Sequence, residues 1–486
     1  MTAKAIMVLG TTSGAGKSWL TTALCRYYAR QGLKVAPFKA QNMSNNARVV
    51  GGGEIGSAQY FQALAANAVP EVRMNPLLLK PERDNHSQVV LLGQVNDELT
   101  QAPWRDRSER VWPTIKTALD ELMAENDVVV VEGAGSPAEI NLKASDVVNM
   151  RVAVAANAAC LLITDIDRGG AFAHLYGTFA LLPPEEQALI KGFVLNKFRG
   201  DASLLSPGPE MLQGMTGVPV VATLPMWWQH GLPEEDGVFD DRSIASGAVT
   251  TTIAVVTYPR ISNLDEFQAL KNVPGVRLKW VRSPTEIIDA DWVILPGSKH
   301  TSGDLAWLRT QGLDAAIATH AAQGKAVLGI CGGLQMLGEA LIDRHDIDGN
   351  GPGLGLLPLV THFEIAKTVQ HRHTQFGKLT GLWSKLSDVN VAGYEIHHGN
   401  TFAQTAQHPA MAMAGDVAVA ALPDSLGWQN QAGNVLGLYL HGMFEDPAVL
   451  QALFGATTPT LDSVFDGLAD YIGQHFEKNF LDSLIL

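Results

Sequence analysis

The chain has 486 residues, of which 46% are hydrophobic and 17% are charged. This composition supplies ample material for a core and excludes a disordered or collagen-like chain, and the length predicts about two to four domains. The formal charge of −14 gives no general attraction for nucleic acid or an anionic membrane, although local basic sites for phosphate stay open.

The three cysteines, Cys25, Cys160 and Cys331, are too few and too scattered for a disulfide framework or a CxxC metal site. We therefore expect a reducing compartment, with Cys25 and Cys160 as buried fillers of apolar segments. The first apolar stretch, Ile6–Leu9, runs straight into a glycine loop, which indicates a strand and not a signal peptide. Because no run of about 18 apolar residues occurs, we expect no membrane partner and a cytoplasmic protein.

In residues 1–232, strand-like and helix-like segments alternate. A helix is expected over Ser18–Gln31, and the four valines of Val128–Val131 indicate a strand covered on both faces. Such alternation predicts a doubly wound, mainly parallel sheet. The other expected strands are Ile6–Leu9, Val35–Phe38, Ala159–Thr164 and Gly192–Leu195.

The stretch 233–250 is polar and rich in Glu, Asp, Gly, Ser and Thr, which predicts a linker. Strands restart at Ile253–Thr257, Val293–Leu295 and Ala326–Ile330, so a second α/β domain is expected over residues 251–448. The remaining segment, 449–486, contains an amphipathic stretch, Leu461–Leu481, that predicts a helix packed on one of the two domains. The expected fold class is therefore α/β, with two doubly wound, mainly parallel-sheet domains.

A glycine-rich segment follows the first expected strand and opens a helix, which is the context of a P-loop. Its residues are Gly10, Thr11, Thr12, Ser13, Gly14, Ala15, Gly16, Lys17 and Ser18. Backbone N–H groups of such a loop surround phosphate oxygens, Lys17 would reach the β- and γ-phosphates, and Ser18 would hold Mg²⁺. Thr11 stands where the usual pattern has glycine, so a turn that binds nothing is the alternative.

Acidic residues at strand ends are candidates to complete the metal site. Glu132 follows the valine strand and Asp165 follows the strand at 159–164, and both ends lie where open parallel sheets bind ligands. Asp167 is a weaker candidate, and a helix cap or a loop salt bridge is the alternative for each. Asn196 ends another strand, and an Asn there reads the adenine edge in related nucleotide folds, although an exposed turn looks the same.

A polar cluster follows the second expected strand. It comprises Lys39, Gln41, Asn42, Ser44, Asn45 and Asn46. Such a loop offers many amide donors and acceptors with little net charge, which suits a polar substrate. The alternative is an ordinary solvated loop. Trp227 and Trp228 precede the linker, and they fit either ordinary packing or the cover of an apolar ring.

Cys331 lies between small residues, after an expected strand and before an expected helix, which is the form of a nucleophile elbow. The N–H of Gly332 can serve an oxyanion hole, and a second donor is expected from the loop containing Gly297.

A cysteine nucleophile needs a base, and His441 ends a late strand after Cys331 in chain order. His397 and His398 are the main competitors. Met443 stands where an acidic partner of His441 usually occurs, and the nearest acid is Glu445. A Cys–His dyad without a firm third member is therefore the prediction.

Taken together, these segments resemble the cobyrinate amidase family. The asparagine-rich and Asp-Arg-Gly-Gly stretches are the more specific, since GKS and Cys elbow motifs are shared widely. Thr11 and the weak acid partner of His441 also fit this family. The matching stretches, which span nearly the whole chain, are Gly10–Ser18, Gln41–Asn46, Glu132–Leu142, Asp165–Phe172, Asn196–Gly200, Gly329–Gly333, Gly393–Gly399 and Tyr439–Gly442.

The resemblance implies a dethiobiotin synthetase-like P-loop domain and a flavodoxin-like class I glutamine amidotransferase domain. It implies that ATP, Mg²⁺ and glutamine are used to amidate carboxylates of a small-molecule corrinoid in cobalamin biosynthesis. Within the family the match is close to members that convert the b, d, e and g side chains of adenosylcobyrinic acid a,c-diamide. Ammonia freed at Cys331 would travel by a sheltered route to an acyl phosphate, and a homo-oligomer stays open.

Three alternatives remain at this point. A cobyrinic acid a,c-diamide synthase shares both chemistries and differs in the carboxylates that it takes. Another ATP-dependent glutamine amidotransferase, such as CTP synthase, lacks the asparagine-rich stretch. A P-loop partitioning ATPase typically carries a second lysine early in its loop, where this chain has Thr12 and Ser13.

Overall fold

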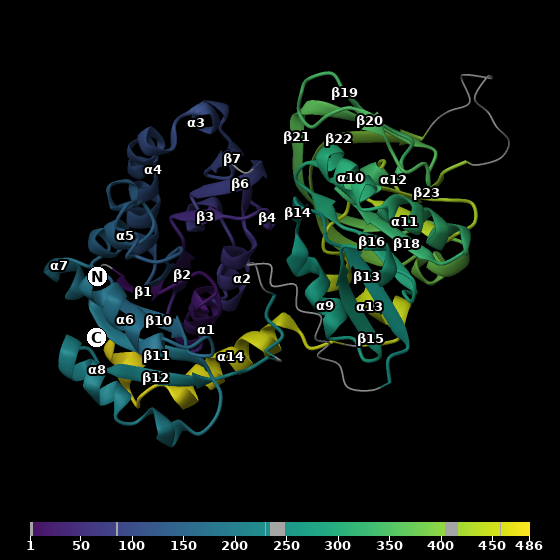
Figure 1. The fold of residues 1–486 in the computed structure, drawn as a ribbon. Coiled ribbons are helices and arrows are strands. Elements are labelled where there is room, and N and C mark those ends of the chain that lie inside the picture. The colour runs from purple at the N-terminus through teal and green to yellow at the C-terminus, as the bar shows by residue number, and fades with distance from the viewer. Residues whose placement is uncertain (1–2, 84–85, 229, 234–247, 404–416, 457) are drawn as a thin grey trace.

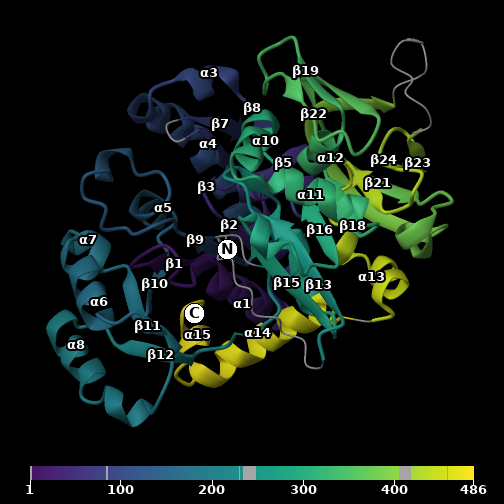
Figure 2. The same cartoon turned by 45° about the vertical axis from the view of Figure 1, so that its right-hand side comes forward.

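The computed structural model describes residues 3–83, 86–228, 230–233, 248–403, 417–456 and 458–486. Two bodies lie side by side, the first in purple to teal and the second mainly in green (Figures 1 and 2). The yellow C-terminal segment returns to the first body, where Lys4 Nζ donates to the Leu486 carbonyl at 2.8 Å. Along these described ranges, no helix combines the length and apolar character needed to cross a membrane.

Six parallel strands form the central sheet of the first body, in the order β12-β11-β10-β1-β9-β2. Because β1 pairs with β9 on one side and β10 on the other, the strand order reverses at β1, and ligands of such sheets bind beyond the carboxyl ends at this point. The strands are β1 (Lys4–Gly10), β2 (Val35–Phe38), β9 (Val128–Glu132), β10 (Ala159–Asp165), β11 (Ile190–Phe198) and β12 (Val220–Pro225).

Both faces of this sheet are covered, which explains its continuous apolar strands. In β1, Ile6 and Val8 join one buried cluster, and Met7 and Leu9 join the cluster on the opposite face. Cys25 and Cys160 are fully buried within these clusters, as predicted, and burial raises the pKa of the Cys160 thiol to about 12. The helices of this body are α1 (Lys17–Ala29), α2 (Ser57–Ala65), α3 (Asp97–Gln101), α4 (Trp104–Glu125), α5 (Met150–Ala155), α6 (Ala171–Ala180), α7 (Pro184–Gln187) and α8 (Gly208–Thr216).

Residues 39–46 are not simply a loop, because Gln41–Met43 forms the short strand β3. It pairs with β6 in a four-stranded sheet of order β3-β6-β7-β8, and a separate hairpin, β4 with β5, follows it. Paired strands give this polar segment a fixed position that a solvated loop lacks. The other strands are β4 (Ala47–Val50), β5 (Gly53–Gly56), β6 (Leu77–Arg83), β7 (His86–Leu91) and β8 (Gln94–Val95).

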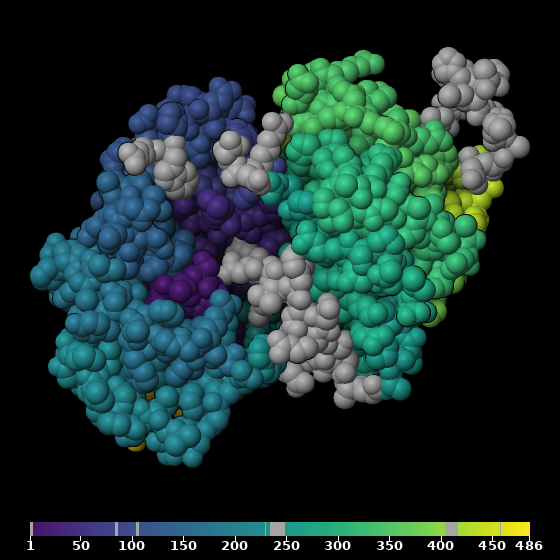
Figure 3. Space-filling model, in the orientation of Figure 1, coloured from purple at the N-terminus to yellow at the C-terminus, as the bar shows by residue number. Residues whose placement is uncertain are grey.

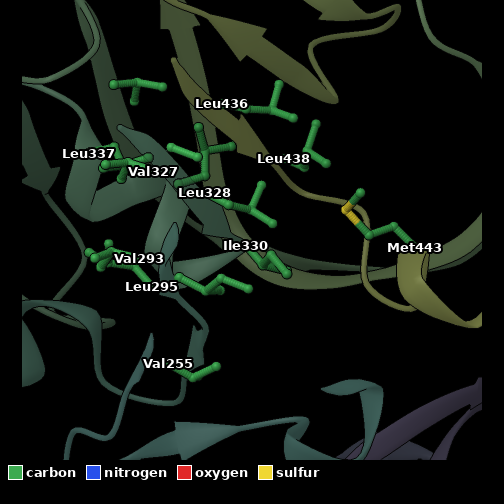
Figure 4. Packing of buried hydrophobic residues seen from close by; sticks show 14 of the residues in the cluster. Val255, Val293, Leu295, Val327, Leu328, Ile330, Leu337, Leu436, Leu438 and Met443 are labelled. Carbon is green, nitrogen blue, oxygen red and sulfur yellow. The ribbon is translucent and has the colours of Figure 1, made fainter. Parts of the chain in front are cut away.

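The second body has a seven-stranded sheet of order β15-β13-β16-β18-β25-β24-β23, and its first five strands are parallel. The last two strands pair antiparallel at one edge. Figure 4 shows Val293, Leu328 and Leu436 among the buried side chains of this sheet. The strands are β13 (Thr251–Val256), β15 (Val276–Val281), β16 (Trp292–Leu295), β18 (Ala326–Ile330), β23 (Val419–Leu422), β24 (Gly427–Gln429) and β25 (Val435–Leu438).

A long antiparallel pair, β21 with β22, lies on the side of the second body that contacts β4 of the first (Figure 1). This pair places the second body's side chains against the hairpin of the first. The remaining elements are β14 (Ile261–Ser262), β17 (Gly297–Ser298), β19 (Ala340–Asp343), β20 (Gly351–Pro352), β21 (Leu359–Gln375), β22 (Asn390–Ala403), α9 (Gln268–Lys271), α10 (Thr301–Thr310), α11 (Leu313–Ala322), α12 (Gly332–Leu337) and α13 (Pro447–Phe454).

The C-terminal prediction of one helix over Leu461–Leu481 is wrong in its extent. The segment forms α14 (Leu461–His475) and α15 (Phe480–Ser483), and between them Phe476 bridges to Ala222 at the sheet edge. This segment packs on α1, where Arg26 Nε lies 2.8 Å from Asp466 Oδ1. Of the predicted linker 233–250, residues 234–247 lie outside the described residues.

Candidate functional site

The P-loop lies between β1 and α1, as its sequence predicts. Lys17 Nζ donates to the carbonyls of Thr12 at 3.1 Å and Gly135 at 3.3 Å, so its ammonium faces the space inside the loop. Gly16 has a φ of 103° and lies against Asn196, so that a Cβ there would be 2.1 Å from Asn196 Nδ2. Glycine is required here both for the backbone angle and for the close approach.

Thr11, the departure from the usual pattern, is buried and serves the loop. Its hydroxyl hydrogen-bonds with that of Thr164 at 2.9 Å, and its N–H donates to the Ile163 carbonyl at 3.0 Å. These bonds attach the loop to β10, so a side chain at this position has a structural use.

Glu132 lies at the centre of a buried polar cluster beneath the loop. Its Oε1 accepts from Ser18 Oγ at 2.7 Å and pairs with Lys39 Nζ at 2.8 Å, while Oε2 accepts from Gln62 Nε2 at 2.5 Å. Burial raises the pKa of Glu132, but Lys39 and the hydrogen bonds outweigh burial and lower it. The cluster therefore holds an ionised carboxylate beside the hydroxyl predicted to bind Mg²⁺. The sequence did not single out Gln62.

Asp165 and Asn196 lie at the adjacent strand ends. Asp165 Oδ2 pairs with Lys197 Nζ at 3.1 Å and with Arg168 Nε at 3.5 Å. Asn196 Nδ2 donates to the Ala15 carbonyl at 2.9 Å, so Asn196 holds the loop. Its predicted contact with adenine stays a prediction. Within the described residues, no cluster of three or more His, Cys, Asp and Glu side chains could hold a metal. Ser18 and Glu132 lie together, whereas Asp165 pairs with Lys197, so the Mg²⁺ site expected from these residues stays a prediction.

Two cavities open on either side of Lys17. One, of about 870 Å³, is lined by Lys39, Gln41, Asn42 and Glu132, so the structure brings these residues together. Ser44 and Asn45 do not line this cavity. The other cavity, of about 300 Å³, is lined by Gly16, Ser18, Asp165, Asn196 and Trp228. Trp227 also lines this cavity, and it stacks on Tyr471 with ring centroids 4.8 Å apart.

Cys331 occupies a strained turn between β18 and α12. Its φ of 52° and ψ of −107° are unusual for a residue with a side chain, and such turns present a nucleophile above a sheet. A Cβ at Gly333 would lie 1.8 Å from the Leu295 carbonyl oxygen, so the helix can approach the sheet only with glycine there. The predicted oxyanion residues adjoin this turn, because Gly332 lies against Ser298 and Gly297 lies against the His441 ring.

His441 lies beside Cys331, and its acidic partner is Glu266. His441 Nδ1 is 3.1 Å from Glu266 Oε1, and the Gly442 N–H donates to Glu266 Oε2 at 2.9 Å. Burial lowers the pKa of His441, but Glu266 and a hydrogen-bonded Cys331 outweigh burial and raise it to about 10. The structure therefore assembles a Cys331–His441–Glu266 triad, of which the sequence analysis found two members.

The competing candidates have other partners. His397 Nε2 lies 2.9 Å from Glu395 Oε2, and its ring stacks on Tyr439. For His398, burial and nearby lysines lower the pKa to about 4. Glu445, the nearest acid in sequence, binds Arg48 of the first body. Of the three histidines, His441 is the one whose pKa the Cys331 side chain raises through a hydrogen bond.

Both bodies line the cavity that contains Cys331. Its volume is about 770 Å³, and Asn45, Glu54 and Lys80 of the first body face Ser298 of the second across it. Glu54 bridges the bodies, because it pairs with Lys80 at 2.9 Å and with Lys367. Figure 3 shows the early residues, in purple and blue, against the green second body. One short segment of the chain thus contributes to both cavities. Gln41 and Asn42 line the cavity of about 870 Å³ beside Lys17, and Asn45 lines the cavity of about 770 Å³ that contains Cys331.

Comparison with known proteins agrees with this two-part arrangement. Residues 6–233 match the model of the CobQ/CobB/MinD/ParA nucleotide binding domain, and residues 252–449 match the CobB/CobQ-like glutamine amidotransferase domain. The chain is 78% identical to the cobyric acid synthase of Polaromonas naphthalenivorans (strain CJ2), over the full length of both chains. It is 75% identical to that of Variovorax paradoxus (strain S110), again over both full lengths, and 73% identical to that of Polaromonas sp. (strain JS666), over 99% of this chain and 98% of the relative.

These matches confirm the resemblance inferred from the motifs, and they bear out the α/β class. The chain belongs to the cobyric acid synthase family and is an ATP-dependent glutamine amidotransferase with a P-loop domain.

Proposed function

We propose that this chain amidates the b, d, e and g carboxylates of adenosylcobyrinic acid a,c-diamide to give cobyric acid, using ATP and glutamine. The observation that carries the proposal is the pairing of two reaction centres in one chain. Cys331 of the Cys331–His441–Glu266 triad lines one cavity and Lys17 lines another. Within one short segment, Gln41 and Asn42 line the cavity of Lys17, and Asn45 lines the cavity of Cys331. A carboxylate is activated at one centre and ammonia is released at the other.

In the P-loop cavity, the terminal phosphoryl group of ATP passes to a substrate carboxylate and makes it a better electrophile. Lys17 neutralises the charge that develops during this transfer. Ser18, Glu132 and Asp165 would hold Mg²⁺, which would neutralise further phosphate charge there. Lys39, Gln41 and Asn42 line the same cavity and are placed to bind the carboxylate and amide groups of the corrinoid.

In the other cavity, the proton of the Cys331 thiol passes to His441, and Sγ attacks the carboxamide carbon of glutamine. The oxyanion that forms accepts hydrogen bonds from backbone N–H groups at Gly332 and Gly297, and His441 donates a proton to the departing ammonia. Because Glu266 holds Nδ1, Nε2 is the nitrogen that exchanges this proton. Water then hydrolyses the thioester, which releases glutamate and restores the thiol.

Ammonia must reach the acyl phosphate without protonation, because ammonium is not a nucleophile. The short distance along the chain between Asn42, at one cavity, and Asn45, at the other, supports a sheltered path past residues 41–45. Replacing Asn45 with Phe would narrow this path, and we expect fewer amides formed per glutamine hydrolysed. If free ammonium supported a Cys331→Ala variant as well as glutamine supports the parent at neutral pH, no shelter would be needed.

Mass spectrometry of the corrinoid product tests the function directly. The protein is incubated with ATP, glutamine and either cobyrinic acid or its a,c-diamide, and the successive amides are counted. We expect four amidations of the a,c-diamide. Amidation of cobyrinic acid that stops at the a and c positions would instead identify an a,c-diamide synthase. ATP hydrolysis without use of glutamine would contradict both assignments.

A further inference from the structure

A segment of the first body reaches the glutaminase triad of the second. This segment, Asn46–Arg48, which we call the interdomain clamp, begins β4. The Arg48 side chain is buried, its Nε donates to Asp265 Oδ2 at 2.9 Å, and its Nη1 donates to Glu445 Oε2 at 2.9 Å. Asp265 and Glu445 both belong to the second body, so one guanidinium fork joins the two bodies through two carboxylates.

The rest of the clamp holds the turn that carries Glu266. The Leu264 N–H donates to Asn46 Oδ1 at 2.9 Å, and Asn263 Nδ2 donates to the Ala47 carbonyl at 2.8 Å. Asn263 has a φ of 57°, a left-handed conformation that few residues other than glycine and asparagine adopt, and its side chain is held by the first body. The position of Glu266, three residues later, therefore depends on contacts that the first body supplies.

The clamp also contacts the residue stacked on His441. The Arg48 guanidinium lies 5.0 Å from the centroid of the Tyr394 ring, and that ring stacks on His441 with centroids 5.3 Å apart and planes 18° apart. Asn263 Nδ2 donates to Tyr394 Oη at 2.8 Å. Arg48 thus supports both members of the His441–Glu266 pair. It supports Glu266 through the turn that contains Asp265, and it supports His441 through the Tyr394 ring.

The positive charge of Arg48 is part of this support. Burial disfavours the Arg48 charge, but Asp265 and Glu445 raise its pKa well above the usual value. Asp265 Oδ1 is buried without a hydrogen-bond partner among the described residues, so Arg48 is the main counter-charge of Asp265. Without Arg48, the buried Asp265 and the half-buried Glu445 would lose the cation that they share.

We propose that Arg48 is a positioning residue of the glutaminase triad, so that glutamine hydrolysis at Cys331 requires the docked first body. This inference rests on the proposed glutaminase role of Cys331. In this proposal, a residue of the ATP-binding half positions catalytic groups of the ammonia-producing half. Arg48 itself touches neither glutamine nor ATP phosphates in the proposed reaction.

The test compares Arg48→Met and Arg48→Lys with Arg26→Met in the full chain. Arg26 is a matched control because it is also a buried arginine of the first body with two carboxylate partners, Asp462 and Asp466. For each variant, kcat and KM for glutamine hydrolysis, the rate of Cys331 alkylation by iodoacetamide, and amidation driven by ammonium chloride are measured. Thermal unfolding is recorded in parallel.

We expect Arg48→Met to lower kcat for glutamine hydrolysis about 10- to 100-fold with little change in KM, because a small displacement of catalytic groups has this effect. Alkylation of Cys331 slows as well, whereas ammonia-driven amidation stays close to that of Arg26→Met. Arg48→Lys keeps the charge but cannot bridge both carboxylates, so an intermediate kcat is expected.

Equal loss of glutamine-driven and ammonia-driven amidation, or a kcat equal to that of Arg26→Met, overturns the inference. If Arg48→Met does not fold, the same comparison is decided with Arg48→Lys. A parent protein that releases no glutamate from glutamine refutes the proposed function itself, and this result is separate from an unchanged kcat in the Arg48 variants.

Discussion

Replacing Glu266 with Gln is the sharpest test of the triad. Glu266 is fully buried and binds both the His441 ring, at 3.1 Å, and the Gly442 N–H, at 2.9 Å. Glutamine has nearly the same shape and keeps one acceptor oxygen, but it removes the negative charge. The variant therefore separates the charge of Glu266 from its packing.

The hydrogen bond between Glu266 and His441 determines how far the pKa of His441 and kcat should fall in this variant. Hydrogen bonds to charged groups contribute about 1.5–3 kcal/mol, and losing this much from the His441 imidazolium lowers its pKa by about one to two pH units. The parent pKa is about 10, because Glu266 and Cys331 outweigh burial. If the same free energy is lost in the transition state, kcat for glutamine hydrolysis falls about 10- to 100-fold.

The pH dependence has a definite sign. Since the folded pKa of His441 lies above the ordinary value of 6.5, its contribution to stability is full below that value and disappears as pH rises through about 10. Glutamine hydrolysis that needs the protonated His441 ring is lost over the same pH range. We therefore expect the alkaline limb of glutamate release to move to lower pH in Glu266→Gln.

Glu395→Gln is the matched control, because Glu395 binds His397 as Glu266 binds His441. Glutamate release is followed across the neutral and alkaline range for the parent and both variants. An alkaline limb that stays in place in Glu266→Gln and moves in Glu395→Gln would falsify the assignment of His441 and favour His397.

Three further substitutions follow from the same geometry. Cys331→Ala removes the nucleophile, so glutamine-driven amidation falls by about 10³-fold or more while ammonia-driven amidation persists, as a product assay with either donor would reveal. Lys17→Met leaves phosphate charge uncompensated, so amidation falls with both donors while glutamate release continues, and selective loss with glutamine alone would contradict this role. Gly333→Ala forces a Cβ against the Leu295 carbonyl, so urea unfolding should show a loss of about 3 kcal/mol or more, and an unchanged midpoint would exclude the close approach.

Contiguous motifs explain which site residues could be predicted. Lys17 and Cys331 each lie in one short segment that joins a strand to a helix. The neighbouring residues in the sequence are therefore enough to predict their structural context. Glu266 has no such signal, because 175 positions separate it from His441 and the pair forms only in the folded chain. The acid nearest His441 in sequence, Glu445, is held by Arg48.

The same distinction applies to the fold. Strands such as Val128–Glu132 are apolar on both faces, and their runs of valine identify them without knowledge of their neighbours. By contrast, Gln41–Met43 is polar and becomes a strand only because β6 pairs with it. The break after His475 also depends on a distant partner, since Phe476 bridges to Ala222. Elements whose stability comes from remote pairing carry little local signal.

The segment Gln41–Arg48 lies at both cavities and at the contact between the two bodies. Its early residues line the P-loop cavity, Asn45 lines the cavity of Cys331, and its last residues form the interdomain clamp. Removing Arg48 from its two carboxylates would leave buried charges unpaired, and such a state costs several kcal/mol. A displacement of this segment at the P-loop cavity would reach Glu266 through backbone and ion pairs rather than through solvent. The short polar segment Gln41–Arg48 is therefore held by strand pairing within the first body and by contacts with the second body. A flexible loop would provide neither.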